Sequence, residues 1–363
     1  MTRLILLCLL IPFSLMSGCA DPGPITSDYG PMSEDPGDGE NAPQGDNLYR
    51  YELEFPAMGV TFKFTGYADD EEVAKTAFDA ARKRIDEIES AITSYNPDSE
   101  AMRLTASAPH SDPVPVSNDL WAMLRYSDRH FLNSHGTFDP TIGKVIDLWR
   151  RARQERILPR NDRIADALNS SGMDNVQLGN KEAYILVEGM KLDFGGLGKG
   201  YAADQAVQVL RSNGVKYCLV DASGDIRCTD AAPGRQSWRV EMNTGMEIKT
   251  QTLSLVNMAV ATSGDINQFV NIDGERYSHI IDPRTGMAIT GSRAVTVLAQ
   301  DAITADALAS SVAVLGQSDG FAMIEQWPDV EARMVWQDEQ GRVMVKLSSG
   351  FPRPPKEDEP SDD

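Results

Sequence analysis

Glycine is concentrated in one short segment of this chain, where four of the six residues from 195 to 200 are glycine. Because glycine has no Cβ, this backbone can approach another group closely. The segment leads into a helix predicted from Tyr201, and a helix N-terminus attracts an anion such as a pyrophosphate. The alternative is a tight turn that only packs a helix on a strand. The sequence contains neither GxxxxGK[ST] nor GxGxxG, which excludes the commonest nucleotide-binding loops.

Hydrophobic periodicity predicts both helices and strands. Val60, Phe62 and Phe64 alternate with polar residues after the turn at 57–59, which is typical of a half-buried strand. Further strands are predicted at 217–220, 253–260, 295–299 and 343–347, and helices at 73–92, 120–131, 203–210 and 303–315. These elements lack the regular alternation of a doubly wound sheet, so the predicted fold class is α+β.

The N-terminal end has the pattern of an export signal. An apolar run from residue 4 to residue 16 follows Arg3 and is too short to span a bilayer stably. Small residues then precede Cys19, where lipoprotein signal peptidase would cut and the cysteine would be acylated. We therefore expect a lipoprotein signal peptide at 1–18 and a chain anchored to the bacterial cell membrane on its periplasmic side. The alternative is an ordinary cleaved signal that happens to contain a cysteine.

Composition divides the rest of the chain. Residues 19–47 are rich in Pro, Gly, Asp, Glu and Ser and predict a flexible acidic tether, and residues 351–363 predict a disordered acidic tail. The folded catalytic domain is therefore expected at 48–350. The formal net charge of -20 argues against nucleic-acid binding, which requires a basic face.

Two cysteines remain in the predicted domain once Cys8 leaves with the signal and Cys19 carries lipid. Cys218 and Cys228 could pair in an oxidising periplasm. Cys218 also lies in an apolar run, where a buried structural thiol is equally expected. No Cys/His spacing typical of zinc sites is present in the sequence.

Residues 278–286 combine a short strand with an Asp-Pro-Arg-Thr-Gly turn. His279 is the informative residue, because a histidine with a near-neutral pKa could accept a hydroxyl proton. A lone histidine is, however, more often a satisfied structural side chain. Arg284 could face a phosphate or only close the turn.

Asp306 and Ser310 stand four residues apart in the helix predicted at 303–315, which places a carboxylate and a hydroxyl on one face. Both are hard oxygen donors. Mg²⁺ takes few such protein ligands and leaves its other positions to water and substrate phosphates. The alternative is a solvated helix face.

Taken together, these segments resemble the flavin transferases of the ApbE type, also called FAD:protein FMN transferases. The resemblance covers most of the predicted domain and follows the order of the family's motifs. Its segments are 57–59, 94–100, 136–143, 193–201, 223–226, 261–265, 278–286 and 305–310.

The resemblance implies an α+β fold with a central FAD cleft and transfer of FMN from FAD to a threonine of a partner protein through a phosphoester bond, with release of AMP. The implied FAD contacts are Met58, Tyr95, Thr137, Phe138, Asp139, Asp193, Lys199, His279 and Ile280. The implied Mg²⁺ ligands are the Gly196 carbonyl, Asp306 and Ser310. His279 and Asp306 are the implied catalytic residues, and Asp193 or a bound water is the alternative base.

The sequence departs from the family pattern at a few positions. Ser310 stands where the family usually has threonine, which keeps the hydroxyl and loses the methyl group that stiffens the rotamer. Val60 replaces a common threonine, and residues 221–225 read Asp-Ala-Ser-Gly-Asp in place of Asn-Ala-Gly-Gly-Asp. Neither of these two changes removes an implied metal ligand.

The resemblance also implies that the acceptor is a respiratory or redox membrane protein with an exposed threonine. Two alternative functions are open: a Mg²⁺-dependent FAD pyrophosphatase that gives free FMN and AMP, and a non-catalytic FAD-binding lipoprotein. Tyr95 favours the transferase over the pyrophosphatase, because an aromatic side chain at a cleft can exclude water. Retention of Asp306, Ser310 and His279 argues against simple binding.

Overall fold

The computed structural model describes residues 48–242, 244–246, 251–265 and 268–353. The predicted signal peptide, Cys19, the whole predicted tether and the tail from residue 354 lie outside these residues.

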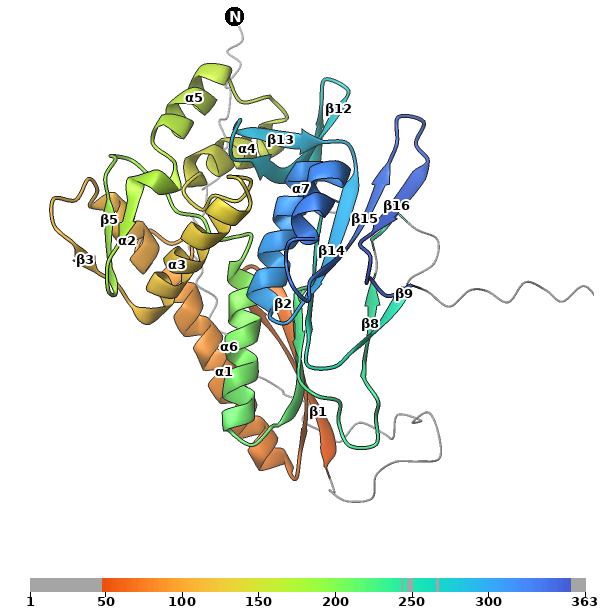
Figure 1. Cartoon of the computed structure of the whole chain (residues 1–363). Coiled ribbons are helices and arrows are strands. Elements are labelled where there is room, and N and C mark those ends of the chain that lie inside the picture. The colour runs from red at the N-terminus through yellow and green to blue at the C-terminus, as the bar shows by residue number, and fades with distance from the viewer. Residues whose placement is uncertain (1–47, 243, 247–250, 266–267, 354–363) are drawn as a thin grey trace, which may run out of the picture.

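An eight-stranded sheet in which all pairs are antiparallel forms the centre of the fold (Figure 1). In spatial order its strands are β1 (Tyr49–Ala57), β2 (Val60–Ala68), β6 (Tyr217–Ala222), β7 (Ile226–Cys228), β10 (Ala259–Gly264), β14 (Arg293–Ala299), β15 (Glu331–Gln337) and β16 (Val343–Leu347). The first hairpin turns in two residues, Met58 and Gly59, whose φ angles of 50° and 76° suit the right-handed twist of the strands. This arrangement confirms the α+β prediction.

Three long helices cover one face of the sheet (Figure 1): α1 (Glu71–Ile92), α6 (Gly198–Ser212) and α7 (Ala302–Ile324). Each was predicted from its apolar spacing. α7 bends at Gly316, whose φ of 78° and ψ of −165° are not helical, and the bend follows the end of the predicted helix. α7 alone among the described helices is long and apolar enough to cross a membrane, but most of it is buried in the core.

The opposite face carries a second apolar core beneath the hairpin of β8 (Trp238–Met242) and β9 (Gln251–Leu255). The prediction of one strand at 253–260 was wrong. The chain reverses at Asn257, whose φ is 47°, so β9 pairs with β8 while β10 joins the central sheet. An apolar run does not reveal such a turn, and asparagine tolerates the left-handed conformation.

The two buried cysteines lie on opposite faces of the central sheet. Cys218 in β6 belongs to the core under the helices, whereas Cys228 in the neighbouring β7 belongs to the second core. Both thiols are free, and burial raises the pKa of each, that of Cys218 to about 12. Of the two possibilities that the sequence left open, the buried structural thiol is therefore the one found.

A smaller helical part stands beside the sheet (Figure 1). Its elements are α2 (Glu100–Ala106), β3 (Val114–Pro115), α3 (Asn118–Asn133), α4 (Gly143–Glu155), α5 (Asn161–Asn169), a 3-10 helix (Met173–Asn175), β4 (Val176–Leu178) and β5 (Glu182–Ile185). A three-stranded sheet of β11 (Phe269–Ile272), β12 (Glu275–Asp282) and β13 (Met287–Thr290) packs with α4 and α5 around Trp149 and also contacts α7.

The folded part extends past its predicted end at residue 350. Phe351 is only 2% exposed and packs in the second core, and the Gln251 side chain donates to the Pro352 carbonyl at 2.9 Å. A single aromatic residue in a Pro-rich, acidic segment does not stand out in composition, which explains why the predicted boundary precedes it.

Candidate active site

Asp193 holds the start of the glycine-rich turn. Its carboxylate accepts hydrogen bonds from the Gly195 N–H at 2.9 Å, the Ser94 hydroxyl at 2.8 Å and the Arg150 guanidinium at 2.8 Å. It is 7% exposed. Asp193 therefore ties the turn to the segment before Tyr95 and to α4.

Three glycines of the turn lie in close contact with other segments. A Cβ on Gly200 would lie 2.2 Å from the Ala302 carbonyl oxygen, so α6 and α7 begin in direct contact. A Cβ on Gly196 would lie 3.3 Å from the Phe138 ring and 3.4 Å from the Ser310 hydroxyl. The packing interpretation is thus correct for Gly200, while Gly196 adjoins two implied site residues. Gly198 has similar contacts with Met58, whose N–H donates to Glu89 at 2.9 Å.

Asp306 and Ser310 point toward the turn from the first half of α7. Asp306 is 5% exposed and accepts a hydrogen bond from the Gly200 N–H at 3.2 Å. Burial raises the pKa of the Asp306 carboxyl, and the charge of Lys199 opposes this shift. The Ser310 hydroxyl lies 3.4 Å from that of Ser263. A solvated helix face is therefore the wrong interpretation for Asp306.

Lys199 lies between two buried carboxylates. Its ammonium contacts Asp225, which is 2% exposed, and lies 4.0 Å from Asp306. Sequence reasoning gave Asp225 no role, although it belongs to one of the segments that carry the resemblance. One positive and two negative charges leave the group with a net negative charge.

This donor set fits Mg²⁺. Asp306 offers a carboxylate, Ser310 offers a hydroxyl, and the Gly196 backbone lies alongside, so all donors would be hard oxygens. A divalent cation would also balance the excess negative charge around Lys199. Among the described residues no group of three or more His, Cys, Asp and Glu could hold a metal. Besides the Asp306 carboxylate, such an ion would therefore need neutral oxygens and substrate phosphates as ligands.

α7 is fixed in this position from α6. The Asp204 carboxylate accepts hydrogen bonds from the Ala302 and Ile303 N–H groups at 2.9 and 3.0 Å. Burial raises the pKa of Asp204 to about 7. Together with the Gly200 contact, these bonds set the distance between Lys199 and Asp306.

His279 lies in a bulge of β12. From Tyr277 to Ile281 this strand advances four residues while its partner β13 advances two, from Thr290 to Ala288. Such bulges redirect side chains near active sites. The His279 Nδ1 lies 3.2 Å from the Gln268 carbonyl oxygen, which can only accept, so Nδ1 carries the hydrogen and Nε2 keeps its lone pair.

The surroundings of His279 keep it neutral. Burial lowers its pKa to about 4, the Gln268 carbonyl opposes that shift, and the charges of Arg153 and Lys199 lower the pKa further. At neutral pH His279 is therefore uncharged, with its lone pair at Nε2.

Tyr95 is 78% exposed and is held by Arg150, whose guanidinium carbon lies 4.4 Å from the centre of the ring. The same guanidinium binds Asp193. Sequence reasoning missed Arg150, because an arginine in an amphipathic helix carries no signal that separates it from a solvated residue.

The remaining implied FAD contacts use their side chains within the protein. The Thr137 hydroxyl donates to the Ser134 carbonyl at 2.8 Å, and Asp139 accepts from the Thr141 N–H and hydroxyl at 2.8 and 2.6 Å. Burial raises the pKa of Asp139. The side chains of Phe138 and Ile280 are apolar and buried.

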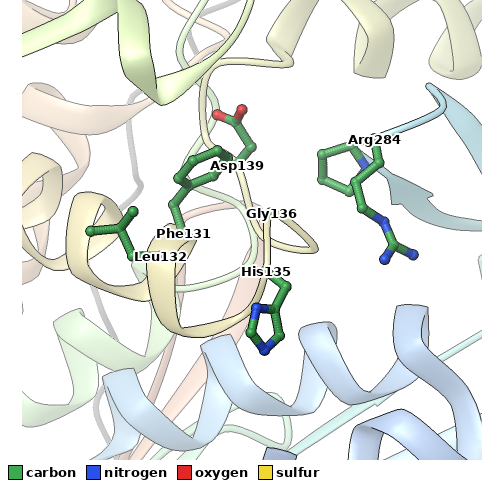
Figure 2. Close-up of a pocket in the computed structure, with 7 residues that line it drawn as sticks. Phe131, Leu132, His135, Gly136, Asp139 and Arg284 are labelled. Carbon is green, nitrogen blue, oxygen red and sulfur yellow. The ribbon is translucent and has the colours of Figure 1, made fainter.

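A cavity of about 430 Å³ lies beside these loops (Figure 2). It is lined by Phe131, Leu132, His135, Gly136, Asp139, Pro283 and Arg284. Asp139 is its only implied FAD contact, and neither His279 nor Asp306 lines it. Arg284 turns back on Asp282 at 2.8 Å, so it closes its own turn. The chemistry is better placed at the glycine-rich turn.

This chain is similar to several known proteins. The profile of the ApbE family matches residues 58–334. The FAD:protein FMN transferase of Treponema pallidum is 31% identical over 280 residues, which cover 72% of this chain and 76% of that protein. Its counterpart in Vibrio cholerae is 27% identical over 284 residues, which cover 75% and 84%.

Solved structures give the same result. The flavin transferase ApbE from Vibrio cholerae superposes with a TM-score of 0.75 at 26% identity and covers 84% of this chain and 98% of that one. The ApbE protein of Thermotoga maritima gives a TM-score of 0.73 at 27% identity, with 83% and 98% covered. The resemblance stated from the sequence motifs is thereby confirmed, and the chain belongs to the ApbE family of flavin transferases.

Proposed function

We propose that this chain transfers FMN from FAD to a threonine hydroxyl of an acceptor protein and releases AMP, with Mg²⁺ held by Asp306, Ser310 and the Gly196 carbonyl. The observation that carries the proposal is the pair of buried carboxylates, Asp225 and Asp306, on either side of Lys199 at the end of the glycine-rich turn. The FAD:protein FMN transferases among its relatives support the choice of flavin substrate.

In the proposed reaction the threonine oxygen attacks the phosphorus of the FMN half of FAD. A P–O bond forms to threonine, the P–O bond to the AMP half breaks, and AMP leaves with the electron pair of that bond. The hydroxyl proton passes to a base. When bound, Mg²⁺ supplies positive charge for the pyrophosphate oxygens.

The residues of the chain orient the reactants and move the proton. The turn at 195–200 and the Lys199 ammonium face the pyrophosphate, while neutral His279 accepts the hydroxyl proton at Nε2. Asp193 is less suited as the base, because three hydrogen bonds from Ser94, Arg150 and Gly195 occupy its oxygens.

One assay separates this function from its two rivals. The chain is incubated with FAD, Mg²⁺ and a threonine peptide, and the intact mass of the peptide and the AMP released are measured. We expect a peptide heavier by one FMN group for each AMP. A pyrophosphatase would give AMP and free FMN with or without peptide, and a binding protein would release no AMP.

We also propose that Cys19 is acylated and anchors the chain on the periplasmic side of the membrane, near respiratory or redox membrane acceptors. The support is the sequence pattern of residues 1–19. The full chain should partition with membranes and incorporate labelled palmitate. A Cys19→Ala variant that still incorporates palmitate would contradict this proposal.

A further inference from the structure

His130 is a buried histidine of α3 that contacts α7. It is 1% exposed, and its Nε2 lies 2.9 Å from the Ser311 hydroxyl. That hydroxyl donates its own hydrogen to the Ala307 carbonyl at 3.0 Å, so its oxygen accepts and Nε2 carries the ring hydrogen. Burial lowers the pKa of His130 to about 4, against the opposing effect of the Ala307 carbonyl, so the ring is neutral at pH 7. The hydrogen bond between α3 and α7 therefore joins two neutral groups.

Burial of this imidazole costs stability. Its Nδ1 has no hydrogen-bond partner among the residues that the structure describes, and neither does the Ser127 hydroxyl one turn earlier. A buried polar atom without a partner loses its hydration and gains nothing in return. Leucine has a similar volume and would avoid this cost. Departures of this kind are expected at functional sites.

The ring of His130 lies between the two segments that carry the neutral ligands proposed for Mg²⁺. On one side it binds Ser311, which directly follows Ser310 in α7. On the other side it packs edge-on against the Phe138 ring, with ring centroids 5.2 Å apart and planes at 70°. The Phe138 ring in turn lies 3.3 Å from the position of a Cβ on Gly196. His130 therefore connects the hydroxyl ligand to the carbonyl ligand.

Two contacts from α3 fix the part of α7 that carries the proposed ligands. The Tyr126 hydroxyl donates to that of Thr304 at 3.0 Å, two residues before Asp306. The His130 bond reaches α7 one residue after Ser310. α3 thus holds α7 on both sides of the two ligands. Because Mg²⁺ demands nearly ideal octahedral geometry, a small displacement of a donor weakens its binding.

We propose that His130 is a positioning residue for Mg²⁺, which keeps the Ser310 hydroxyl and the Gly196 carbonyl in place as ligands of the ion. This inference rests on the metal site of the proposed function. The charge of Asp306 attracts a cation over several ångströms, whereas a neutral oxygen contributes only in direct contact with the ion. Loss of His130 should therefore weaken Mg²⁺ binding although no ligand is removed.

The test measures the Kd for Mg²⁺ of the full chain by titration calorimetry, with FAD present and no acceptor, and the Tm before Mg²⁺ is added. His130→Leu removes both ring nitrogens, including the unpartnered Nδ1, so its Tm should stay close to that of wild type. Its Kd for Mg²⁺ should rise about tenfold, the equivalent of one hydrogen bond. His130→Gln should restore most of the affinity, because its amide can still donate to Ser311.

Ser311→Ala removes the other partner of the same bond and should raise the Kd for Mg²⁺ by a similar factor. The double variant with His130→Leu should raise it no further, since both changes remove one interaction. Ser127→Ala is the matched control, because it removes the other unpartnered polar atom of α3 and no hydrogen bond to α7. Its Kd should equal that of wild type.

A His130→Leu protein with a lowered Tm and a wild-type Kd for Mg²⁺ would give His130 a purely structural role and overturn the inference. An equal rise of the Kd in Ser127→Ala would also overturn it, because any loosening of α3 would then have the same effect. If wild-type protein binds no Mg²⁺, the proposed metal site is wrong and the inference falls with it. If wild-type protein binds Mg²⁺ but transfers no FMN to a threonine peptide, the proposed function fails, and the expected pattern of Kd values would still support the role of His130.

Discussion

Replacement of Asp306 by asparagine removes one charge from the site and almost no volume. The amide oxygen can still accept the Gly200 N–H, which lies 3.2 Å from the carboxylate. At 4.0 Å the attraction between Asp306 and Lys199 is about 4 kcal/mol with an effective dielectric constant of about 20. Burial of the carboxylate opposes this attraction, as the raised pKa of Asp306 indicates, and Lys199 keeps its contact with Asp225. Without metal, the stability of Asp306→Asn should therefore stay close to that of wild type.

The two proteins should differ once Mg²⁺ is added. An ion at about 100 times its Kd stabilises the folded state by about 2.7 kcal/mol. For a domain of about 300 residues that corresponds to a rise in Tm of about 4 °C. Asp306→Asn lacks the only charged ligand, so its Tm should hardly change, and its rate of AMP release should fall at least about a hundredfold.

The assay is thermal unfolding with increasing Mg²⁺ at a constant FAD concentration, followed by measurement of AMP release. Asp319→Asn is the matched control, because Asp319 is an exposed carboxylate on the same helix and should behave like wild type. An Asp306→Asn protein with a wild-type Mg²⁺ response in Tm and with normal AMP release would refute the assignment of the metal site.

Three further predictions concern single side chains. If His279 is the base, its titration should not change kcat/KM just below neutral pH. The value of kcat/KM should fall near pH 4, because His279 is neutral above its lowered pKa of about 4. The same shift contributes stability that is fully present above about pH 6.5 and is lost as the pH falls through about 4. His279→Gln should slow transfer by about a hundredfold with little change in FAD affinity; an unchanged rate would assign the base elsewhere. Ser310→Thr should stay active, whereas Ser310→Ala should need more Mg²⁺ for half-maximal AMP release, since water replaces a neutral ligand more easily than a charged one. Identical Mg²⁺ titrations of Ser310→Ala and wild type would remove Ser310 from the ligand set. Arg150→Ala should raise the KM for FAD and lower the Tm, because Asp193 loses a charged hydrogen bond worth about 1.5–3 kcal/mol. Arg150→Lys should restore little, as an ammonium cannot reproduce both contacts; full recovery would show that only the charge matters.

The sequence predicted those parts of the fold in which local pattern and tertiary packing agree. The apolar spacing of α1 extends over its whole length, so the predicted helix and the observed one nearly coincide. The turn at Met58 and Gly59 followed from its glycine and the alternation after it. The placement of Asp306 and Ser310 on one face of the same helix could be predicted from helical geometry alone.

Other features depend on contacts between distant segments and left no local signal. Asn257 divides one apolar run between two sheets, and its conformation is fixed by where β9 and β10 pair. The bulge at His279 is visible only in the register against β13. Arg150 and Asp225 gain their roles from Asp193 and Lys199, which are far away in the sequence.

The contact between Gly200 and the Ala302 carbonyl has a consequence for how the site tolerates change. A methyl group at position 200 would lie 2.2 Å from that oxygen, so alanine there must push the first turn of α7 away from α6. Lys199 is the residue before Gly200, and Asp306 lies just inside α7. The displacement would therefore lengthen the distance between ammonium and carboxylate. Gly200→Ala neither adds nor removes charge, yet it would weaken the attraction between Lys199 and Asp306. The distance between these two charged groups depends on the lack of a methyl group at position 200.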